Sequence, residues 1–262
     1  MYSIIDTHAH LDEMENLDVM LENARRAGVI AIVAVGSNYQ SNVKTLEISQ
    51  KHYPFVYPAL GLHPCELVDI GSSEIDNNLR FIEENITSAV AIGEIGLDYN
   101  KRVVKEAPKE LQKNVLRQLL SLAKKYVKPV AIHSRYAWKD ALQLVQNAAV
   151  DKAVFHWFTG FSSVLRDIID GGYYISATPA AEYHEEHRRA VREAPLNRLL
   201  LETDCPVTYG REVKYESRID DVLRSLRAVA QLKEIGVDTI ARQTTSNATR
   251  FFSLDIVFER RR

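Results

Sequence analysis

Histidine and acidic side chains recur directly after short apolar segments of this sequence. The pattern begins with His8 and His10, which follow an apolar start and Asp6. Because they are two residues apart on an extended chain, their side chains point to the same side and can bind one metal ion. Further polar residues stand in the same position after later apolar segments: His63, Glu94, His133, His156 and Asp204. Imidazoles combined with a few carboxylates are typical of a divalent-metal site.

Each of these side chains has an expected role in a site with two divalent metal ions. Glu94 would bridge the ions through its two oxygens, and His133 and His156 would serve the second ion. Two cations about 3.5–4 Å apart lower the pKa of a shared water molecule and polarise the scissile oxygen. Asp204 would bind a cation and act as general base toward the water and general acid toward the leaving group.

Further residues near the segment ends and in expected loops have more than one interpretation. His63 either contacts a substrate phosphate or a group behind the ligands, or is a hydrogen-bonded histidine of a turn that ends in Pro64. Glu202 either orients a ligand or a water molecule, or forms a buried ion pair with Arg135. Basic side chains near expected loops would contact a nucleic-acid backbone or form a solvated rim: Lys101, Arg102, Lys105, Arg135 and Arg211.

Eight short apolar segments alternate with amphipathic helical stretches. They predict strands at Ser3–Ile5, Val29–Val35, Phe55–Leu60, Ala89–Ile92, Pro129–Ile132, Ala153–Phe155, Tyr173–Ser176 and Leu199–Leu201. Continuous apolar strands that alternate with helices indicate a parallel sheet covered by helices. Eight such units predict an α/β fold of the (β/α)8 TIM-barrel type, in which the strand ends converge on one catalytic face. A last helix, about Asp238–Phe251, would cap the C-terminal end.

Length and composition favour one domain over residues 1–262, because no linker or low-complexity tract divides the chain. The formal net charge of −2 gives no global electrostatic case for nucleic-acid binding, although bound cations would supply local positive charge. Cys65 and Cys205 are interpreted as reduced thiols. We find no signal peptide and no apolar run that spans a membrane, so we expect a cytoplasmic protein with no obligate protein partner. The tail Glu259–Arg262 is expected to fray.

Six motifs together resemble the TatD family of metal-dependent hydrolases, within the wider amidohydrolase-like barrel superfamily. They begin at Asp6, Gly61, Gly93, His133, His156 and Glu202, and read DTHAHL, GLHP, GEIGLDY, HSRYA, HWFTG and ETDCP. The resemblance covers nearly the whole chain. It implies that His8, His10, Glu94 and Asp204 hold one metal, and that Glu94, His133 and His156 hold the other. It also implies a nuclease acting on DNA, while some relatives are deacylases of D-aminoacyl-tRNA.

Two positions depart from the family pattern. Val207 follows Pro206 where the family more often has an aromatic residue, and Trp157 replaces a smaller residue. Both line the expected substrate mouth, so they bear on the substrate rather than on the metal site. The identity of the metal stays open among Zn²⁺, Mn²⁺, Fe²⁺ and Mg²⁺.

The sequence leaves three classes of function to compare. The first is a deoxyribonuclease that hydrolyses phosphodiester bonds, and the second is an ester or amide hydrolase on the same dinuclear site. The third, a non-catalytic metal-binding or interaction protein, is disfavoured because all six expected ligands are present. A serine nucleophile is not supported either, since no Gly-x-Ser-x-Gly elbow occurs in the chain.

Overall fold

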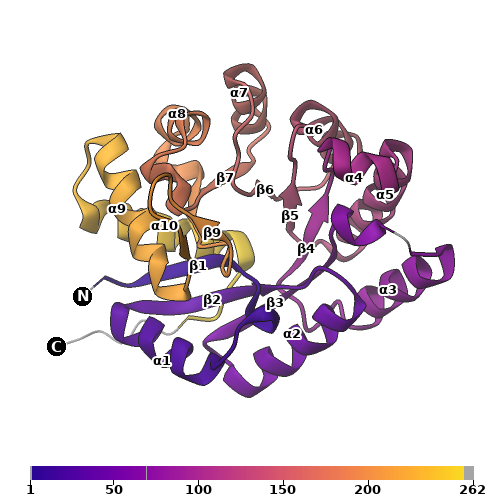
Figure 1. Cartoon of the computed structure of the whole chain (residues 1–262), viewed down its shortest axis with the longest axis horizontal. Helices are drawn as coiled ribbons and strands as arrows, with labels where there is room; N and C mark the ends of the chain where they lie inside the picture. The colour runs from indigo at the N-terminus through magenta and orange to yellow at the C-terminus, as the bar shows by residue number, and fades with distance from the viewer. Residues whose placement is uncertain (1, 69, 257–262) are drawn as a thin grey trace.

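Eight parallel strands form one sheet in which every strand pairs with its neighbour in the sequence. The structure is a computed structural model that describes residues 2–68 and 70–256. The strands are β1 Ile4–Ala9, β2 Val29–Val35, β3 Val56–Leu62, β4 Ala91–Gly96, β5 Val130–His133, β6 Ala153–Phe155, β7 Tyr174–Ala177 and β8 Leu199–Leu201. Figure 1 shows helices following the strands around this sheet. The prediction of a (β/α)8 barrel is confirmed.

The predicted strands differ from the observed ones mainly at their carboxyl ends. β2, β6 and β8 have the predicted bounds, whereas the other five strands run further. β1 continues past Ile5 to include His8, and β4 continues past Ile92 to include Glu94. The side chains of these polar residues point into the site rather than into the apolar core. The strands can therefore continue through them.

Two apolar clusters divide the residues of each strand between the inside and the outside of the barrel. Ile4 and Ile32 belong to a large cluster that includes helix residues such as Leu119. Their neighbours Ile5 and Val33 belong to a second, smaller cluster. Alternation along a strand sends successive side chains to opposite faces, so the second cluster fills the barrel interior.

The helices that cover the sheet are mostly amphipathic and follow the strands in order. They are α1 Leu17–Ala27, α2 Tyr39–His52, α3 Ser72–Glu84, α4 Lys101–Glu106, α5 Lys109–Tyr126, α6 Trp138–Asn147, α7 Ser162–Asp170, α8 Glu185–Glu193, α9 Val222–Lys233 and α10 Val237–Phe252. The end of α10 packs Phe251 and Phe252 into the interior cluster and so closes one end of the barrel. Within residues 2–68 and 70–256, no helix is long and apolar enough to cross a membrane. The expected frayed tail, Glu259–Arg262, lies outside the described residues.

Strands β1 and β8 close the barrel through the segment that follows β8. The N–H of Asp204 donates a hydrogen bond to the carbonyl of His8 at 2.9 Å. The buried carboxylate of Asp6 accepts one from the N–H of Thr203 at 3.0 Å and another from its hydroxyl at 2.6 Å. These bonds hold Asp204 beside His8, although the two residues come from opposite ends of the chain.

Candidate metal centre

The six expected metal ligands meet at the carboxyl ends of the strands, around the buried carboxylate of Glu94. Its Oε2 lies 3.1 Å from Nε2 of His8 and 3.4 Å from Nε2 of His10. Its Oε1 lies 2.6 Å from Nε2 of His156 and 2.9 Å from Nδ1 of His133. The two oxygens of one carboxylate therefore face two different pairs of imidazoles.

A bulge in β4 turns Glu94 into the barrel. From Ile92 to Ile95, β4 advances three residues while β5 advances two, from Val130 to Ile132. The extra residue breaks the alternation of the strand, so Glu94 can point inward. Gly61 on β3 allows this bulge, because a Cβ there would lie 2.3 Å from the carbonyl oxygen of Glu94.

Asp204 completes the first group of donors. Its Oδ1 lies 3.5 Å from Nε2 of His8 and 3.5 Å from Nε2 of His10. The two rings stand edge to face with their centroids 5.3 Å apart. Asp204 has a φ of 53°, a left-handed conformation that is uncommon outside glycine and is held here by its hydrogen bond to His8. These three residues are close enough together to hold one metal ion.

On the other side of Glu94, two imidazoles present nitrogen atoms to each other. Nδ1 of His133 lies 3.3 Å from Nε2 of His156. The remaining nitrogen of each ring faces a buried carboxylate: Nε2 of His133 lies 3.2 Å from Asp98, and Nδ1 of His156 lies 3.5 Å from Glu202. Protons on these outward nitrogens leave two lone pairs facing Glu94, an arrangement that a cation would satisfy.

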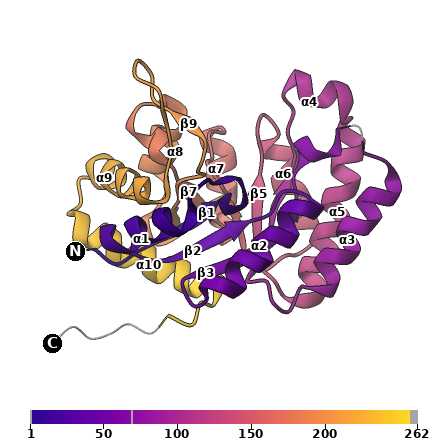
Figure 2. The same ribbon diagram turned by 60° about the horizontal axis from the view of Figure 1, so that its bottom comes forward.

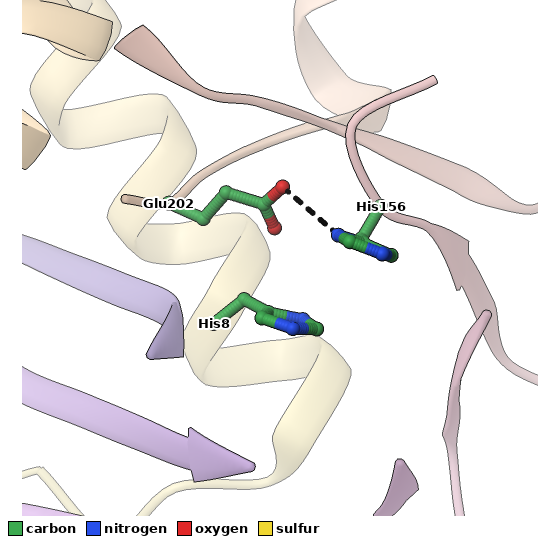
Figure 3. A group of neighbouring side chains, drawn as sticks. All are labelled: His8, His156 and Glu202. Atoms are coloured by element: carbon green, nitrogen blue, oxygen red, sulfur yellow. Dashed lines mark ion pairs between the residues drawn. The ribbon is translucent and has the colours of Figure 1, made fainter. Parts of the chain in front are cut away.

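Glu202 lies beside two of the expected ligands, His8 and His156 (Figure 3). Its Oε1 accepts a hydrogen bond from the N–H of Trp157 at 3.1 Å, which fixes the carboxylate beside His156. The rings of His8 and His156 stack with centroids 4.3 Å apart. His8, His156 and Glu202 also form a group that is compact enough to hold a metal ion.

Sequence reasoning missed Asp98 as a site residue, although it stands in the motif GEIGLDY. Asp98 is fully buried and pairs with Arg135 at 2.7 Å as well as with His133. The suggested ion pair between Arg135 and Glu202 is therefore not observed. The available signal was a carboxylate four residues after Glu94, near the end of the same strand.

His63 reaches the centre, but its hydrogen bonds argue against a ligand role. Nδ1 accepts a hydrogen bond from the N–H of Cys65 at 3.1 Å, and Nε2 lies 3.4 Å from Oε1 of Glu94. A neutral imidazole whose Nδ1 accepts must carry its proton on Nε2. Nε2 is then a hydrogen-bond donor that points into the site rather than a metal ligand. His63 therefore caps the turn that begins with Pro64 and also faces the centre.

The electrostatics of the centre favour positive charge beside ionised carboxylates. Burial alone would lower the pKa of His10, but Asp204 and Glu94 outweigh burial and raise it well above its usual range. Burial would likewise raise the pKa of Glu94, yet the imidazoles, with His156 first among them, hold it well below its usual range. The pKa of Asp204 is lowered against burial by the hydrogen bond with His10. Such surroundings suit a bound cation.

The centre opens into a cavity of about 920 Å³. Arg135 lines this cavity and is about half exposed, at 47% of its side chain. The other basic residues with a possible role in nucleic-acid binding lie further out. Lys101, Arg102 and Lys105 are on α4, and Arg211 is in the loop of the antiparallel hairpin β9 Thr208–Tyr209 and β10 Tyr215–Glu216. Figure 2 shows α4 and this hairpin projecting at the top of the view, on either side of the barrel.

Comparison with known proteins places this geometry in one family. A family model described as TatD related DNase matches residues 5–253. The chain is 32% identical over 259 residues to human deoxyribonuclease TATDN3, covering 95% of this chain and 94% of the relative. It is 31% identical over 262 residues to the uncharacterized metal-dependent hydrolase YabD of Bacillus subtilis, covering 96% and 100%.

A solved structure shows the same fold. The TatD homolog YJJV from Escherichia coli K12 superposes with a TM-score of 0.85 at 27% identity, covering 95% of this chain and 98% of the other. The match of fold and sequence extends over the strands that carry the centre. The chain belongs to the TatD related DNase family.

Proposed function

We propose that this protein is a deoxyribonuclease that hydrolyses phosphodiester bonds with two divalent metal ions. One observation carries the proposal: the two oxygens of Glu94 face separate sets of donors. One set is His8 and His10, both of which also lie near Asp204, and the other is His133 and His156. The human relative at 32% identity is named a deoxyribonuclease.

The donor set fits two cations. Neutral imidazoles bind divalent ions without cancelling their charge, and the few carboxylates add affinity. Asp98 and Glu202 support this fit because each faces the outward nitrogen of a histidine and so directs the other nitrogen inward. When bound, cations of this kind acidify water and polarise the phosphoryl oxygen.

Asp204 is the proposed general base. The carboxylate is almost fully buried, and its lowered pKa keeps it ionised near neutral pH, so it is ready to accept a proton. Its Oδ1 is close to the first pair of imidazoles, on the side of the centre that the cavity reaches. After bond cleavage the same group would return the proton to the leaving oxygen.

His63 and Arg135 are proposed to bind the substrate phosphate. The proton on Nε2 of His63 points toward the centre, and Arg135 is fixed at the cavity wall by two contacts with Asp98, at 2.7 and 2.9 Å. A guanidinium held in this way can pair with a phosphate oxygen without first losing much side-chain freedom. These donors would position an anionic ester next to Asp204.

A panel of substrates tests the proposal. The protein is treated with EDTA, and then assayed with Mn²⁺, Mg²⁺ or Zn²⁺ on nicked DNA, a single-stranded oligonucleotide and D-aminoacyl-tRNA. We expect cation-dependent cleavage of DNA, abolished by Glu94→Gln and retained by Glu22→Gln, which changes an exposed carboxylate on α1. Hydrolysis of D-aminoacyl-tRNA without cleavage of DNA would contradict the phosphodiesterase and assign the same centre to ester bonds.

A further inference from the structure

Three aromatic side chains form a ledge on one wall of the cavity: Tyr136, Trp138 and Phe161. The ring of Trp138 stands edge to face with that of Tyr136 at 6.0 Å and with that of Phe161 at 5.5 Å. The outer two rings remain largely exposed, Tyr136 at 62% and Phe161 at 64%. Large exposed aromatic surfaces beside a catalytic cavity are typical of binding sites.

The ledge is fixed by its packing. Trp138 lies against the loop after β6, where a Cβ on Gly160 would come within 2.6 Å of its Cγ. Only glycine leaves room for the indole there. Tyr136 has a φ of 58°, a conformation that costs free energy in a bulky residue and that tends to cluster at functional sites. Trp138, placed by this packing, contacts both exposed rings and so restricts their positions before any ligand arrives.

In the chain, the residues of the ledge come shortly after the two strands that carry the second pair of imidazoles. Tyr136 comes three residues after His133 at the end of β5, and Phe161 comes five residues after His156 beyond β6. A group bound near those imidazoles would thus have the ledge as its next neighbour in the same cavity.

Two basic side chains lie beside the ledge, in a cavity that acidic residues also line. Arg135 adjoins Tyr136 in the chain, and Arg189 also lines the cavity, where its guanidinium donates to the carbonyl of Gly160. A ligand that fits both features has flat apolar faces and carries negative charge. A nucleotide has both, since each base has a π-face and each linkage a negative charge.

We propose that an unpaired nucleobase next to the scissile phosphodiester stacks on Tyr136 and Phe161, and that Trp138 supports these two rings. The proposal rests on the proposed function. In it, the three aromatic residues position the substrate for hydrolysis. Stacking of one base on an aromatic side chain changes affinity by about 10-fold or more. A base held in this way fixes the phosphate at the centre.

The test compares substrates with and without bases. A single-stranded oligonucleotide and the same strand with abasic residues on both sides of the cleaved bond are assayed with wild type, Tyr136→Ala, Phe161→Ala and the conservative Tyr136→Phe. For the base-bearing strand we expect KM to rise about 10-fold in each alanine variant, with kcat nearly constant and Tyr136→Phe close to wild type. For the abasic strand, wild type and variants should share one raised KM.

A readout other than turnover supports the comparison. 2-Aminopurine next to the cleaved bond should lose fluorescence when it stacks on the wild-type ledge, and lose less with Tyr136→Ala. Far-UV circular dichroism of each variant checks folding, and the wild-type comparison of the two strands needs no variant at all.

The possible failures are distinguishable. If wild type cleaves neither strand, the proposed function fails. If it cleaves both strands with the same KM, and Tyr136→Ala leaves both unchanged, the function stands and the ledge is not a base platform. An equal loss on both strands in the alanine variants, with equal wild-type KM values, would also overturn stacking and indicate a structural effect or a different ligand.

Discussion

Asp98 lies 3.2 Å from Nε2 of His133 and turns the proton of that ring away from the metal centre. The carboxylate is fully buried, and its pKa is held below its usual range; burial opposes this, while His133 and Arg135 outweigh burial. Because Nε2 donates to Asp98, Nδ1 is free to face Glu94 and His156. The charge of Asp98 should therefore increase the affinity of His133 for a cation.

Replacing Asp98 by asparagine should weaken one metal site. The amide keeps the size of the side chain but loses its charge, so we expect about 10- to 100-fold lower affinity for the ion that His133 would hold. Isothermal titration of the metal-free protein measures this directly, and excess cation should restore much of the hydrolysis.

The matched control for this change is Asp140→Asn. Asp140 pairs with Lys113 at 2.9 Å and with the hydroxyl of Tyr99 at 2.7 Å, but contacts none of the expected ligands. The metal affinity of the Asp140→Asn protein should stay within about twofold of that of wild type. Equal affinities in all three proteins would show that Asp98 does not support His133.

Removing the metal should lower thermal stability as well as activity. A cation present at 100 times its Kd stabilises the folded state by about 2.7 kcal/mol. For a chain of this size that corresponds to a fall in Tm of about 5–10 °C after chelation. Differential scanning calorimetry before and after EDTA, with metal content measured, checks this. Glu94→Gln should show a smaller fall, and an unchanged Tm in verified metal-free wild type would refute tight binding by the folded protein.

The sequence was sufficient to predict the fold because strands and site residues are marked by the same feature. Apolar runs such as Ala153–Phe155 show where a strand is buried on both faces, and the polar residue that follows, His156, shows where it reaches the open end. Eight repeats of this unit leave few alternatives to a barrel, and all six expected ligands do meet at one place.

The features that were not predicted depend on pairing between elements. The bulge that turns Glu94 inward follows from the register of β4 with its two neighbours and from close approach at Gly61. The sequence suggested Glu202 as the ion-pair partner of Arg135, and only the folded chain shows that Arg135 pairs with Asp98 instead. A periodic pattern carries no information about such contacts.

Asp204→Asn should reduce turnover by at least about 10²-fold without preventing folding. The amide has nearly the same shape and keeps the backbone hydrogen bond to His8, but it cannot accept the proton from water. Turnover is compared at matched metal content, since Asp204 is also an expected ligand. Near-normal turnover under those conditions would exclude the general-base role.

Protonation of His187 should make the fold less stable in mild acid. This histidine is fully buried on α8; its Nδ1–H donates to the carbonyl of Phe158 at 3.0 Å, and its Nε2 accepts from the N–H of Thr178 at 3.1 Å. The bond from Thr178 requires a neutral ring, because a proton on Nε2 would oppose the N–H of Thr178. Burial, the largest cause, lowers the pKa to about 4 from 6.5.

The direction of this pH effect follows from which state of the protein binds the proton. Between pH 4 and 6.5 the unfolded chain binds a proton at His187 that the folded protein does not, so stability decreases as the pH falls through this window. The full loss is about 3 kcal/mol.

Urea unfolding of wild type and His187→Gln at pH 7 and pH 4.5 isolates this contribution, because other titrating groups cancel in the difference. We expect the difference in free energy of unfolding between the two proteins to narrow by about 2–3 kcal/mol at the lower pH. The control His184→Gln, at a half-exposed position just before α8, should follow wild type. A gap that does not change with pH would mean that His187 is not kept neutral by the fold.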